Sequence, residues 1–349
     1  MAGLTPLELE PSFDPRIWGR RDLGPLFPDR ANLPEPIGEA WLTGPQARFV
    51  NGPFTGSTLS ESWTRLGADV LGTRMRPEGE FPLLTKFLFP EEKLSIQVHP
   101  DDAYARTHGG RLGKTEMWYV VEAKPGARIR LGIKPGIGRD DLQRALGDGT
   151  LEKCLNEIAV AAGDVLFCPA GTVHTIGPGA TLCEIQEPSD TTYRLFDYNR
   201  LTAAGTPRPL HVEQALDVIR FGSEVPRKIT PWPFPHAGSG AWLLLACPYF
   251  ATEKYAGKRA MEFSSDAARF ELLIVTAGSG KLAWEGGERE YASADVFLIP
   301  ARLGAYELRP KRPTTVLLTY VPDLERDFSI RPGEPVPGRW AEVVFPQAP

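Results

Sequence analysis

The sequence lacks features that several classes of protein require. Its four cysteines, Cys154, Cys168, Cys183 and Cys247, are widely spaced and form no CxxC pair, which argues against a thiolate zinc knuckle and against a disulfide-stapled secreted domain. We therefore expect four buried, unpaired thiols. No run of about 18 apolar residues occurs, and the first residues contain neither a basic nor an apolar leader region. These absences predict a cytoplasmic protein without a membrane partner.

Positive charge and histidine are also sparse. The chain has 39 Lys and Arg against 44 Asp and Glu, a net charge of −5, and no basic run. Because nucleic-acid binding needs clustered cations, we expect no nucleic-acid partner. No long apolar surface stripe is visible, which favours a monomer. Only five histidines occur, and none follows His236, so any histidine-based metal chemistry belongs to the first half.

Glycine and proline, by contrast, are abundant, with 35 and 34 copies. They separate short apolar runs, which is typical of strands joined by tight turns. The clearest runs cover residues 82–90, 93–100, 116–123, 127–133, 164–170 and 181–188. Helical spacing is confined to residues 138–149, 150–157 and 211–222. The pattern predicts an all-β protein of the jelly-roll barrel type with a few peripheral helices.

Two observations predict two such barrels in tandem. Residues 222–240 are rich in Pro, Gly and Ser and separate the last helical segment from a new set of strand-like runs. Residues 161–176 are also weakly repeated at 292–308, with Asp164 matching Asp295. In this register His174 becomes Ala305. We predict a metal-binding domain over residues 1–230 and a degenerate copy without metal ligands over 231–349.

Four residues of the first half form a candidate metal site. Gln97 and His99 are two apart on a strand and therefore project from the same face. Glu116 opens the next strand, and His174 follows a Pro-Gly turn that aims its side chain inward. Two imidazoles, a carboxylate and an amide oxygen suit a borderline cation such as zinc. The alternative is that both histidines are merely hydrogen-bonded barrel residues.

The spacing around His174, with a Gly, five residues, a Pro, one residue, a Gly, two residues and the His, resembles the second motif of the cupin superfamily. Cupins are jelly-roll barrels that hold a divalent metal among inward-facing histidines and a glutamate. The QxH at Gln97 departs from the usual HxH, and Pro178 stands where cupins usually have Asn. More specifically, the chain resembles the type I mannose-6-phosphate isomerases. The matching segments are 38–41, 82–88, 94–102, 113–119, 171–177, 187–198 and 209–212.

This resemblance implies an enzyme that interconverts mannose 6-phosphate and fructose 6-phosphate with one Zn²⁺ per chain. It places the metal ligands on Gln97, His99, Glu116 and His174, and the catalytic residues on Arg194, Lys114 and Glu184. It further places substrate-binding residues on Ser95, Lys86 and Asp190, with Ser95 and Lys86 at the phosphate.

Several roles stay open at this point. Lys86 and Lys114 have the alternative of being surface lysines that guard sheet edges, and Arg194 of simply pairing with Asp190 or Asp197. Glu184 has the alternative of orienting a metal-bound histidine, and Ser95 that of being a structural residue. The sequence does not decide whether Lys114 or Glu184 moves the proton.

Two other functions compete with the isomerase. A cupin oxygenase would use iron on a facial triad, which the QxH pattern fits poorly. A sugar-binding cupin, without turnover or with another specificity, would keep the fold and lose the reaction. Metal identity would test the first of these alternatives, and turnover the second.

Overall fold

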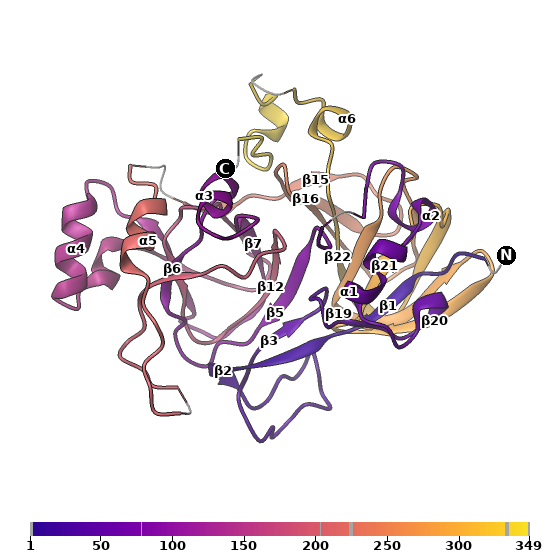
Figure 1. Cartoon of the computed structure of the whole chain (residues 1–349). Helices are drawn as coiled ribbons and strands as arrows, with labels where there is room; N and C mark the ends of the chain where they lie inside the picture. Colours follow the sequence, from indigo (N-terminus) through magenta and orange to yellow (C-terminus); the bar gives the residue numbers. More distant parts are fainter. Residues whose placement is uncertain (1–2, 78, 203, 223–225, 332–334, 348–349) are drawn as a thin grey trace.

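The structure, a computed structural model, describes residues 3–77, 79–202, 204–222, 226–331 and 335–347. Antiparallel strands in three sheets dominate these residues, and the helices are short and lie at the edges (Figure 1). The predicted all-β class with a few peripheral helices is therefore confirmed. None of the helices in the described ranges is long and apolar enough to cross a membrane.

Two sheets form the first half of the molecule. The seven-stranded sheet has the order β14-β10-β7-β12-β5-β3-β2. Its strands are β2 (Ser12–Arg20), β3 (Ile37–Trp41), β5 (Leu84–Leu88), β7 (Glu116–Ala123), β10 (Val165–Cys168), β12 (Ala180–Gln186) and β14 (Lys228–Ile229). The five-stranded sheet has the order β13-β6-β11-β8-β9. Its strands are β6 (Ile96–Val98), β8 (Arg128–Ile133), β9 (Leu155–Ala159), β11 (His174–Ile176) and β13 (Tyr193–Phe196).

These two sheets pack face to face around one apolar core. Trp118 and Leu166 of the seven-stranded sheet contact Ile129, Leu131 and Ile176 of the five-stranded sheet in a buried cluster. Continuously apolar strands such as β10, in which every residue is buried, are what a sheet covered on both faces requires. The six strands predicted from apolar runs are all present, as β5, β6, β7, β8, β10 and β12.

The third sheet has ten strands and belongs mainly to the second half. Eight of its strands come from residues 232–320: β15 (Trp232–Phe234), β16 (Gly240–Ala246), β17 (Ala251–Gly257), β18 (Met261–Ser264), β19 (Glu271–Trp284), β20 (Gly287–Ala292), β21 (Val296–Ile299) and β22 (Ala305–Tyr320). The other two, β1 (Leu7–Glu10) and β4 (Arg48–Phe49), come from the start of the chain, and β1 pairs with β21. The division of the chain near residue 230 stays a prediction.

The helices lie outside the sheets. They are α1 (Leu59–Ser62), α2 (Ala68–Leu71), α3 (Asp102–Thr107), α4 (Arg139–Gly147), α5 (Val212–Val218) and α6 (Leu324–Phe328), with 3₁₀ turns at Gly52–Phe54, Trp63–Arg65, Leu151–Cys154 and Gly338–Trp340. The predictions for 138–149 and 211–222 are confirmed by α4 and α5. The prediction of a helix over 150–157 is wrong beyond its first turn, because the chain enters β9 at Leu155 and pairs with β8.

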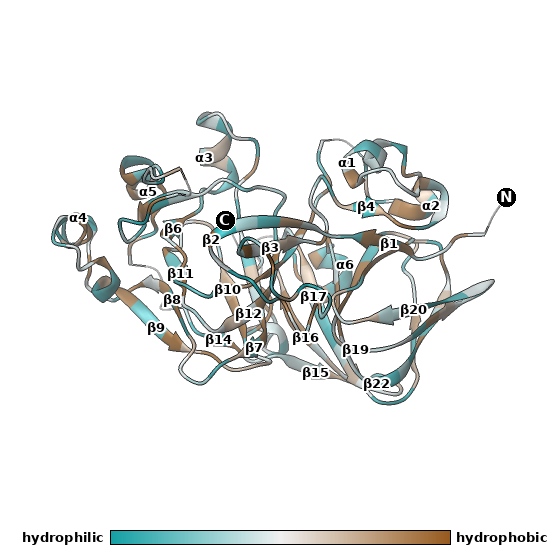
Figure 2. Cartoon of the chain, turned by 90° about the horizontal axis from the view of Figure 1, so that it is seen from below, coloured by the Kyte–Doolittle hydropathy of each residue, from teal (hydrophilic) through white to brown (hydrophobic). Residues whose placement is uncertain are grey.

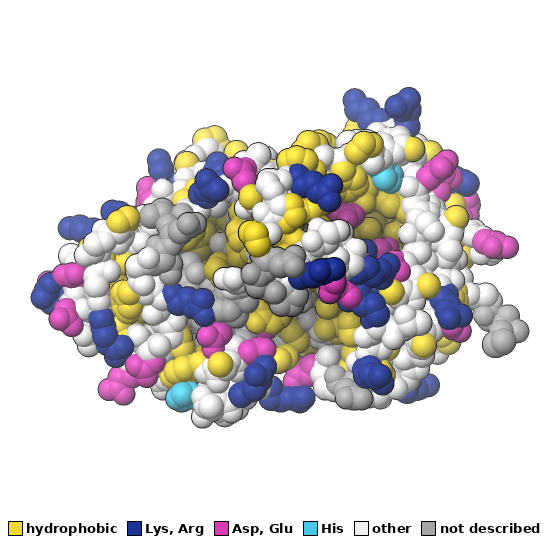
Figure 3. Space-filling model, turned by 90° about the horizontal axis from the view of Figure 1, so that it is seen from above, with side chains coloured by type: hydrophobic (Ala, Val, Ile, Leu, Met, Phe, Trp, Pro, Cys, Tyr) yellow, Lys and Arg dark blue, Asp and Glu magenta, His cyan; other side chains and the backbone are white. Residues whose placement is uncertain are grey.

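Hydropathy follows this layering. Figure 2 shows hydrophobic stretches in the strands at the middle of the molecule, whereas the outlying strand β20 is hydrophilic. On the face shown in Figure 3, Lys and Arg side chains are interspersed with Asp and Glu. All four cysteines are buried and unpaired, as expected.

Candidate active site

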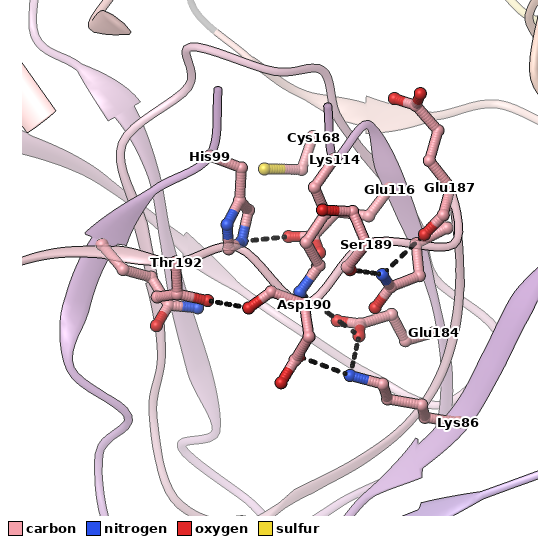
Figure 4. A network of polar contacts seen from close by, with 12 residues as sticks. Lys86, His99, Lys114, Glu116, Cys168, Glu184, Glu187, Ser189, Asp190 and Thr192 are labelled. Atoms are coloured by element: carbon pink, nitrogen blue, oxygen red, sulfur yellow. Dashed lines mark hydrogen bonds and ion pairs between the residues drawn. The ribbon is translucent and has the colours of Figure 1, made fainter. Parts of the chain in front are cut away.

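Three buried side chains converge between the two sheets of the first half. His99 follows β6, Glu116 opens β7 and His174 opens β11. One potential ligand atom of each lies within 4.8 Å of the others. Nε2 of His99 and Nε2 of His174 lie 3.6 and 3.3 Å from Glu116 Oε1. Figure 4 shows His99 and Glu116 turned toward each other. All three side chains are about 1% exposed, so the cluster is preformed and excludes solvent.

Backbone carbonyls set the tautomers of both histidines. His99 Nδ1 lies 2.8 Å from the carbonyl oxygen of Thr191, and His174 Nδ1 lies 3.0 Å from that of Thr172. A carbonyl only accepts hydrogen bonds, so each Nδ1 carries the proton and each Nε2 presents a lone pair to the cluster. This arrangement is typical of metal-binding histidines.

The polar atoms at the centre of the cluster are incompletely paired, although Lys114 Nζ lies 3.3 Å from Glu116 Oε2. Among the described residues, His99 Nε2 and both carboxylate oxygens of Glu116 are buried without a hydrogen bond. Leaving buried polar atoms unpaired is costly, and a bound cation would satisfy all three. If the histidines were only hydrogen-bonded barrel residues, the contacts of their Nδ1 atoms would be explained. The lack of hydrogen bonds at His99 Nε2 and at the Glu116 carboxylate would not be. The residues therefore fit a metal ion.

The electrostatics of the cluster also suit a cation. Burial lowers the pKa of His174 to about 4 and lowers the pKa of His99, so both imidazoles are neutral near pH 7. Burial alone would raise the pKa of Glu116, but the Lys114 ammonium outweighs it and holds that pKa well below its usual range. The cluster thus offers two neutral imidazoles and one carboxylate, each in its metal-binding protonation state.

Gln97 lies beside the cluster as the sequence predicted, but its amide is turned. The residue is paired with His174 across β6 and β11, and its Nε2 lies 3.2 Å from His174 Nε2. Its Oε1 accepts a hydrogen bond from Ser95 Oγ at 3.0 Å. A rotation of the amide by 180° would bring the oxygen to the cluster, and such orientations are assigned from hydrogen bonds alone. Its role as a ligand stays a prediction.

Lys114 and Glu184 lie next to the cluster and differ in their charge state near neutral pH. Lys114 Nζ lies 3.3 Å from Glu116 Oε2 and 3.9 Å from Glu184 Oε1. Burial alone would lower the pKa of Lys114, but Glu116 and Glu184 outweigh it and raise that pKa, so the lysine stays charged. Burial and the nearby Glu116 raise the pKa of Glu184 to about 7. Trp118 Nε1 donates to Glu184 Oε2 at 2.9 Å and orients it.

Lys86 is enclosed by carboxylates. It is 1% exposed, and its Nζ lies 3.2 Å from Asp190 Oδ1, 3.7 Å from Glu39 Oε2 and 3.9 Å from Glu184 Oε1. Figure 4 shows Lys86 pointing at Asp190 and Glu184. Lys114 is 4% exposed. The alternative that both lysines are surface guards of a sheet edge is therefore wrong.

Arg194 on β13 has no carboxylate partner among the described residues. The alternative pairing is not found there: Asp190 binds Lys86, and Asp197 binds Arg200 and Arg208. Burial and the nearby Arg208 lower the pKa of Arg194, and its buried Nε makes no hydrogen bond within the same described part of the chain. Two guanidinium groups close together and only partly compensated are a typical anion site.

One cavity connects these groups. The charged side chains that line it are Arg16, Glu39, Lys114, Glu184, Asp190, Arg194 and Arg208, together with Ser95, Gln97 and His174. Sequence reasoning missed Arg16, Glu39 and Arg208. Glu39 lies within residues 38–41 and Arg208 directly precedes residues 209–212, two of the segments that carry the family resemblance. Their position in or beside these segments was the signal that could have identified them.

Comparison with known proteins agrees with this site. Residues 7–123 match the family model "Phosphomannose isomerase type I, catalytic domain". Mannose-6-phosphate isomerase from Streptococcus mutans is 34% identical over 312 residues, which cover 86% of this chain and 94% of that protein. Mannose-6-phosphate isomerase ManA from Bacillus subtilis is 35% identical over 318 residues, covering 87% and 95%. The crystal structure of mannose 6-phosphate isomerase from Bacillus subtilis has a TM-score of 0.83 at 32% identity, covering 90% of this chain and 99% of that one. The chain belongs to the type I phosphomannose isomerase family of enzymes.

Proposed function

We propose that this enzyme interconverts mannose 6-phosphate and fructose 6-phosphate by zinc-assisted proton transfer through an enediol. The observation that carries the proposal is the buried His99, Glu116 and His174 cluster, which opens into a cavity with both a titratable carboxyl and an unpaired arginine. The isomerisation moves one proton between adjacent carbons and develops negative charge on oxygen. It therefore needs a group that titrates near neutral pH and groups that stabilise an oxyanion.

His99, Glu116 and His174 would hold the zinc ion, with Gln97 as a fourth ligand after its amide turns. Zinc prefers nitrogen and oxygen ligands of this kind, and catalytic sites leave a position for water or substrate. When bound, zinc would supply Lewis-acid polarisation of the sugar oxygens. Metal analysis of the purified enzyme distinguishes zinc from iron and other divalent metals.

We assign the proton transfer to Glu184 and a supporting role to Lys114. A pKa of about 7 lets Glu184 both accept and return a proton near neutral pH. Lys114 stays charged and, at 3.9 Å from Glu184 Oε1, favours the ionised form of that carboxyl once it has lost its proton. Arg194 would stabilise the enediolate and assist ring opening through its fixed fork of donors.

The phosphate group of the substrate has several candidate contacts. Ser95 and Lys86 are candidates, with Asp190 as a further substrate contact, yet Lys86 is already surrounded by three carboxylates. Arg208 lines the cavity together with Arg194, and its one carboxylate partner among the described residues is Asp197, through Oδ2 at 2.7 Å and Oδ1 at 2.5 Å. A dianionic phosphate is better matched to this pair of arginines, so we add Arg208 to the phosphate candidates.

Two broader assignments accompany the proposal. We propose that residues 1–230 form the catalytic domain and 231–349 a second domain without metal ligands, because every proposed ligand precedes residue 230. We also propose a monomeric cytoplasmic enzyme; four unpaired buried cysteines suit a reducing compartment. Light scattering of the purified protein tests the oligomeric state.

The decisive experiment is a coupled assay for fructose 6-phosphate formed from mannose 6-phosphate, before and after chelation and zinc re-addition. We expect turnover that chelation abolishes and zinc restores. If no metal supports turnover while mannose 6-phosphate still binds, the alternative of a non-catalytic sugar-binding cupin holds. Turnover of other sugar phosphates in preference to mannose 6-phosphate would indicate a different specificity.

A further inference from the structure

Three consecutive backbone amides around Lys114 are anchored from outside the cavity. Gly113 N donates to Asp102 Oδ1 at 2.7 Å, Lys114 N donates to the Pro100 carbonyl at 3.0 Å, and Thr115 N donates to Glu187 Oε1 at 2.7 Å. A Cβ on Gly113 would lie 2.6 Å from the carbonyl carbon of Asp101, so only glycine allows this approach. The segment that presents Lys114 and Glu116 is thus held by two acidic side chains.

Glu187 is the more deeply buried of the two. It is 2% exposed, and burial together with the nearby Asp102 raises its pKa to about 8. A carboxyl with this pKa is largely protonated near neutral pH, which the nearby Asp102 carboxylate favours, and its Oε1 accepts a hydrogen bond from Thr115 N. Asp102 in turn pairs with Arg106 at 2.8 Å on the outer side.

Glu187 also begins the loop on the opposite wall of the site. Gln186 Nε2 donates to the carbonyl oxygens of Glu187 at 2.8 Å and of Ser189 at 2.6 Å. The next residues are Asp190, which contacts Lys86, and Thr191, whose carbonyl sets the tautomer of His99. Figure 4 shows Ser189 near the centre of the network, between Glu187 and Asp190. Glu187 therefore links two segments of the site. One carries Lys114, and the other contains the Thr191 carbonyl that orients His99.

The second half of the chain covers this junction. Cys247 and Tyr249 lie in the turn between β16 and β17. Cys247 belongs to the same buried cluster as Met117 and Ile185, and Tyr249 packs against that cluster. The second half of the chain thus packs on β7 and β12, the strands next to Thr115 and Glu187.

We propose that Glu187, acting with Asp102, is a positioning residue of this enzyme that holds Lys114 and Glu116 in their working geometry. Glu187 does not line the cavity, so it acts through Thr115 and the following strand and not on the substrate. Residues that orient a metal ligand or an acid–base group typically account for about 10- to 100-fold in activity or metal affinity, and small displacements of reacting groups cost similarly.

The test compares Glu187→Gln with Glu187→Met. The glutamine keeps an acceptor for Thr115 N, whereas methionine keeps only the volume. We expect kcat of the Gln variant within about 3-fold of wild type, and kcat of the Met variant lower by about 10- to 100-fold with KM changed less than about 3-fold. Zinc affinity, measured by competition with a chromophoric chelator, should fall in the Met variant only.

Two further variants keep the test interpretable. Glu271→Met removes another buried carboxyl, one whose burial raises its pKa to about 8 and which does not line the cavity, and should lower stability without changing kcat. Asp102→Ala removes the acceptor of Gly113 N at a partly exposed position, and should lower kcat by about 5- to 10-fold even if Glu187→Met does not fold. Wild-type kcat in Asp102→Ala, or equal losses in the Gln and Met variants, would overturn the proposal.

The activity readout rests on the proposed isomerase function, but two readouts do not. Hydrogen exchange of the Thr115 amide should accelerate in Glu187→Met and not in Glu187→Gln, and zinc affinity should follow the same order. If wild type has no turnover, the isomerase proposal fails while these two measurements still decide the positioning role. Unchanged exchange and unchanged zinc affinity in Glu187→Met would reject it.

Discussion

Glu116 and Glu271 occupy the same place in the two halves of the chain. Glu116 opens β7 and lies opposite Cys168 of β10; Glu271 opens β19 and lies opposite Ile299 of β21. The repeat extends to the turns before β10 and β21, where Asp164 Oδ2 and Asp295 Oδ2 each accept a backbone amide three residues earlier, at 2.7 Å. A buried carboxyl at this point is therefore common to both halves.

What differs is the surroundings of the two carboxyls. Lys114 holds the pKa of Glu116 well below its usual range, whereas burial raises the pKa of Glu271 to about 8 against the effect of Arg269. Where the first half has His174, the second has Ala305. Backbone position alone therefore does not prepare a carboxyl to bind a metal; it also needs neighbours that keep it ionised and that present imidazole lone pairs.

The strongest test of the comparison is to neutralise each carboxyl in turn. Glu116→Gln should lose at least about 100-fold in kcat/KM and most of its bound zinc. The loss of a metal ligand should cost more than the loss of a residue that only orients a ligand, which costs about 10- to 100-fold. Glu271→Gln should retain turnover within about 2-fold. Coupled assays and atomic absorption measure both. Equal losses in the two variants would show that Glu116 acts through stability.

Each of the two carboxyls has a cation two residues before it in the sequence, and the two cations have different surroundings. Lys114 Nζ lies 3.3 Å from Glu116, and Arg269 Nε lies 3.8 Å from Glu271 while its guanidinium stacks 3.5 Å above the Tyr320 ring. Lys114→Met should lower kcat by about 10²- to 10⁴-fold, since the proton-transfer step loses its charged neighbour. Arg269→Met should lower the midpoint of urea unfolding and leave kcat near wild type. Retained turnover in Lys114→Met would remove it from the reaction.

A third comparison contrasts two cations: Arg208 lines the cavity, whereas Lys86 is buried and does not line it. Lys86 has three carboxylate neighbours, whereas Arg208 pairs with one carboxylate among the described residues, Asp197. Arg208→Ala should raise KM for mannose 6-phosphate by about 10-fold, the equivalent of one charge-assisted hydrogen bond. Lys86→Ala should raise KM less and lower stability more, because it leaves buried carboxylates uncompensated. Steady-state kinetics measure both KM values. A larger increase in KM for Lys86→Ala than for Arg208→Ala would assign the phosphate contact to Lys86.

The smallest expected effect is a pH dependence of stability from Glu271. Its pKa is about 8 in the folded protein and near 4.5 when unfolded, so unfolding releases a proton between these pH values. Stability from this group is full below about pH 4.5 and is lost as pH rises toward about 8, at no more than about 1.4 kcal/mol per pH unit. Urea unfolding should be less pH-dependent in Glu271→Gln than in wild type, with the exposed Glu290→Gln as control. Identical pH profiles for all three proteins would contradict the assignment.

The two halves of the chain are joined by both strand pairing and side-chain packing. The ten-stranded sheet includes β1 and β4 from the start of the chain. Cys247 of the second half lies in the same buried cluster as Met117 and Ile185 of the first. The second half therefore packs directly against the half that contains the His99, Glu116 and His174 cluster.

Much of the site was accessible from local sequence. The pairing of Gln97 with His99, the Pro-Gly turn before His174 and the position of Glu116 at a strand start depend on two-residue periodicity and turn chemistry, which act over a few residues. The same rules located β5, β6, β7, β8, β10 and β12. They failed at residues 150–157, where helical spacing was overridden by pairing of β9 with β8.

By itself, the sequence determined the fold class, the repeat and the residues that could bind a metal, because these follow from periodicity, composition and spacing along the chain. Only the tertiary structure decided that Lys86 is enclosed by Glu39, Glu184 and Asp190, that Arg208 lies beside Arg194, and that Glu187 supports Lys114. These depend on contacts between segments far apart in the chain. The pKa that separates Glu184 from Lys114, and Glu116 from Glu271, arises from burial and neighbouring charge, which exist only once those segments have packed together.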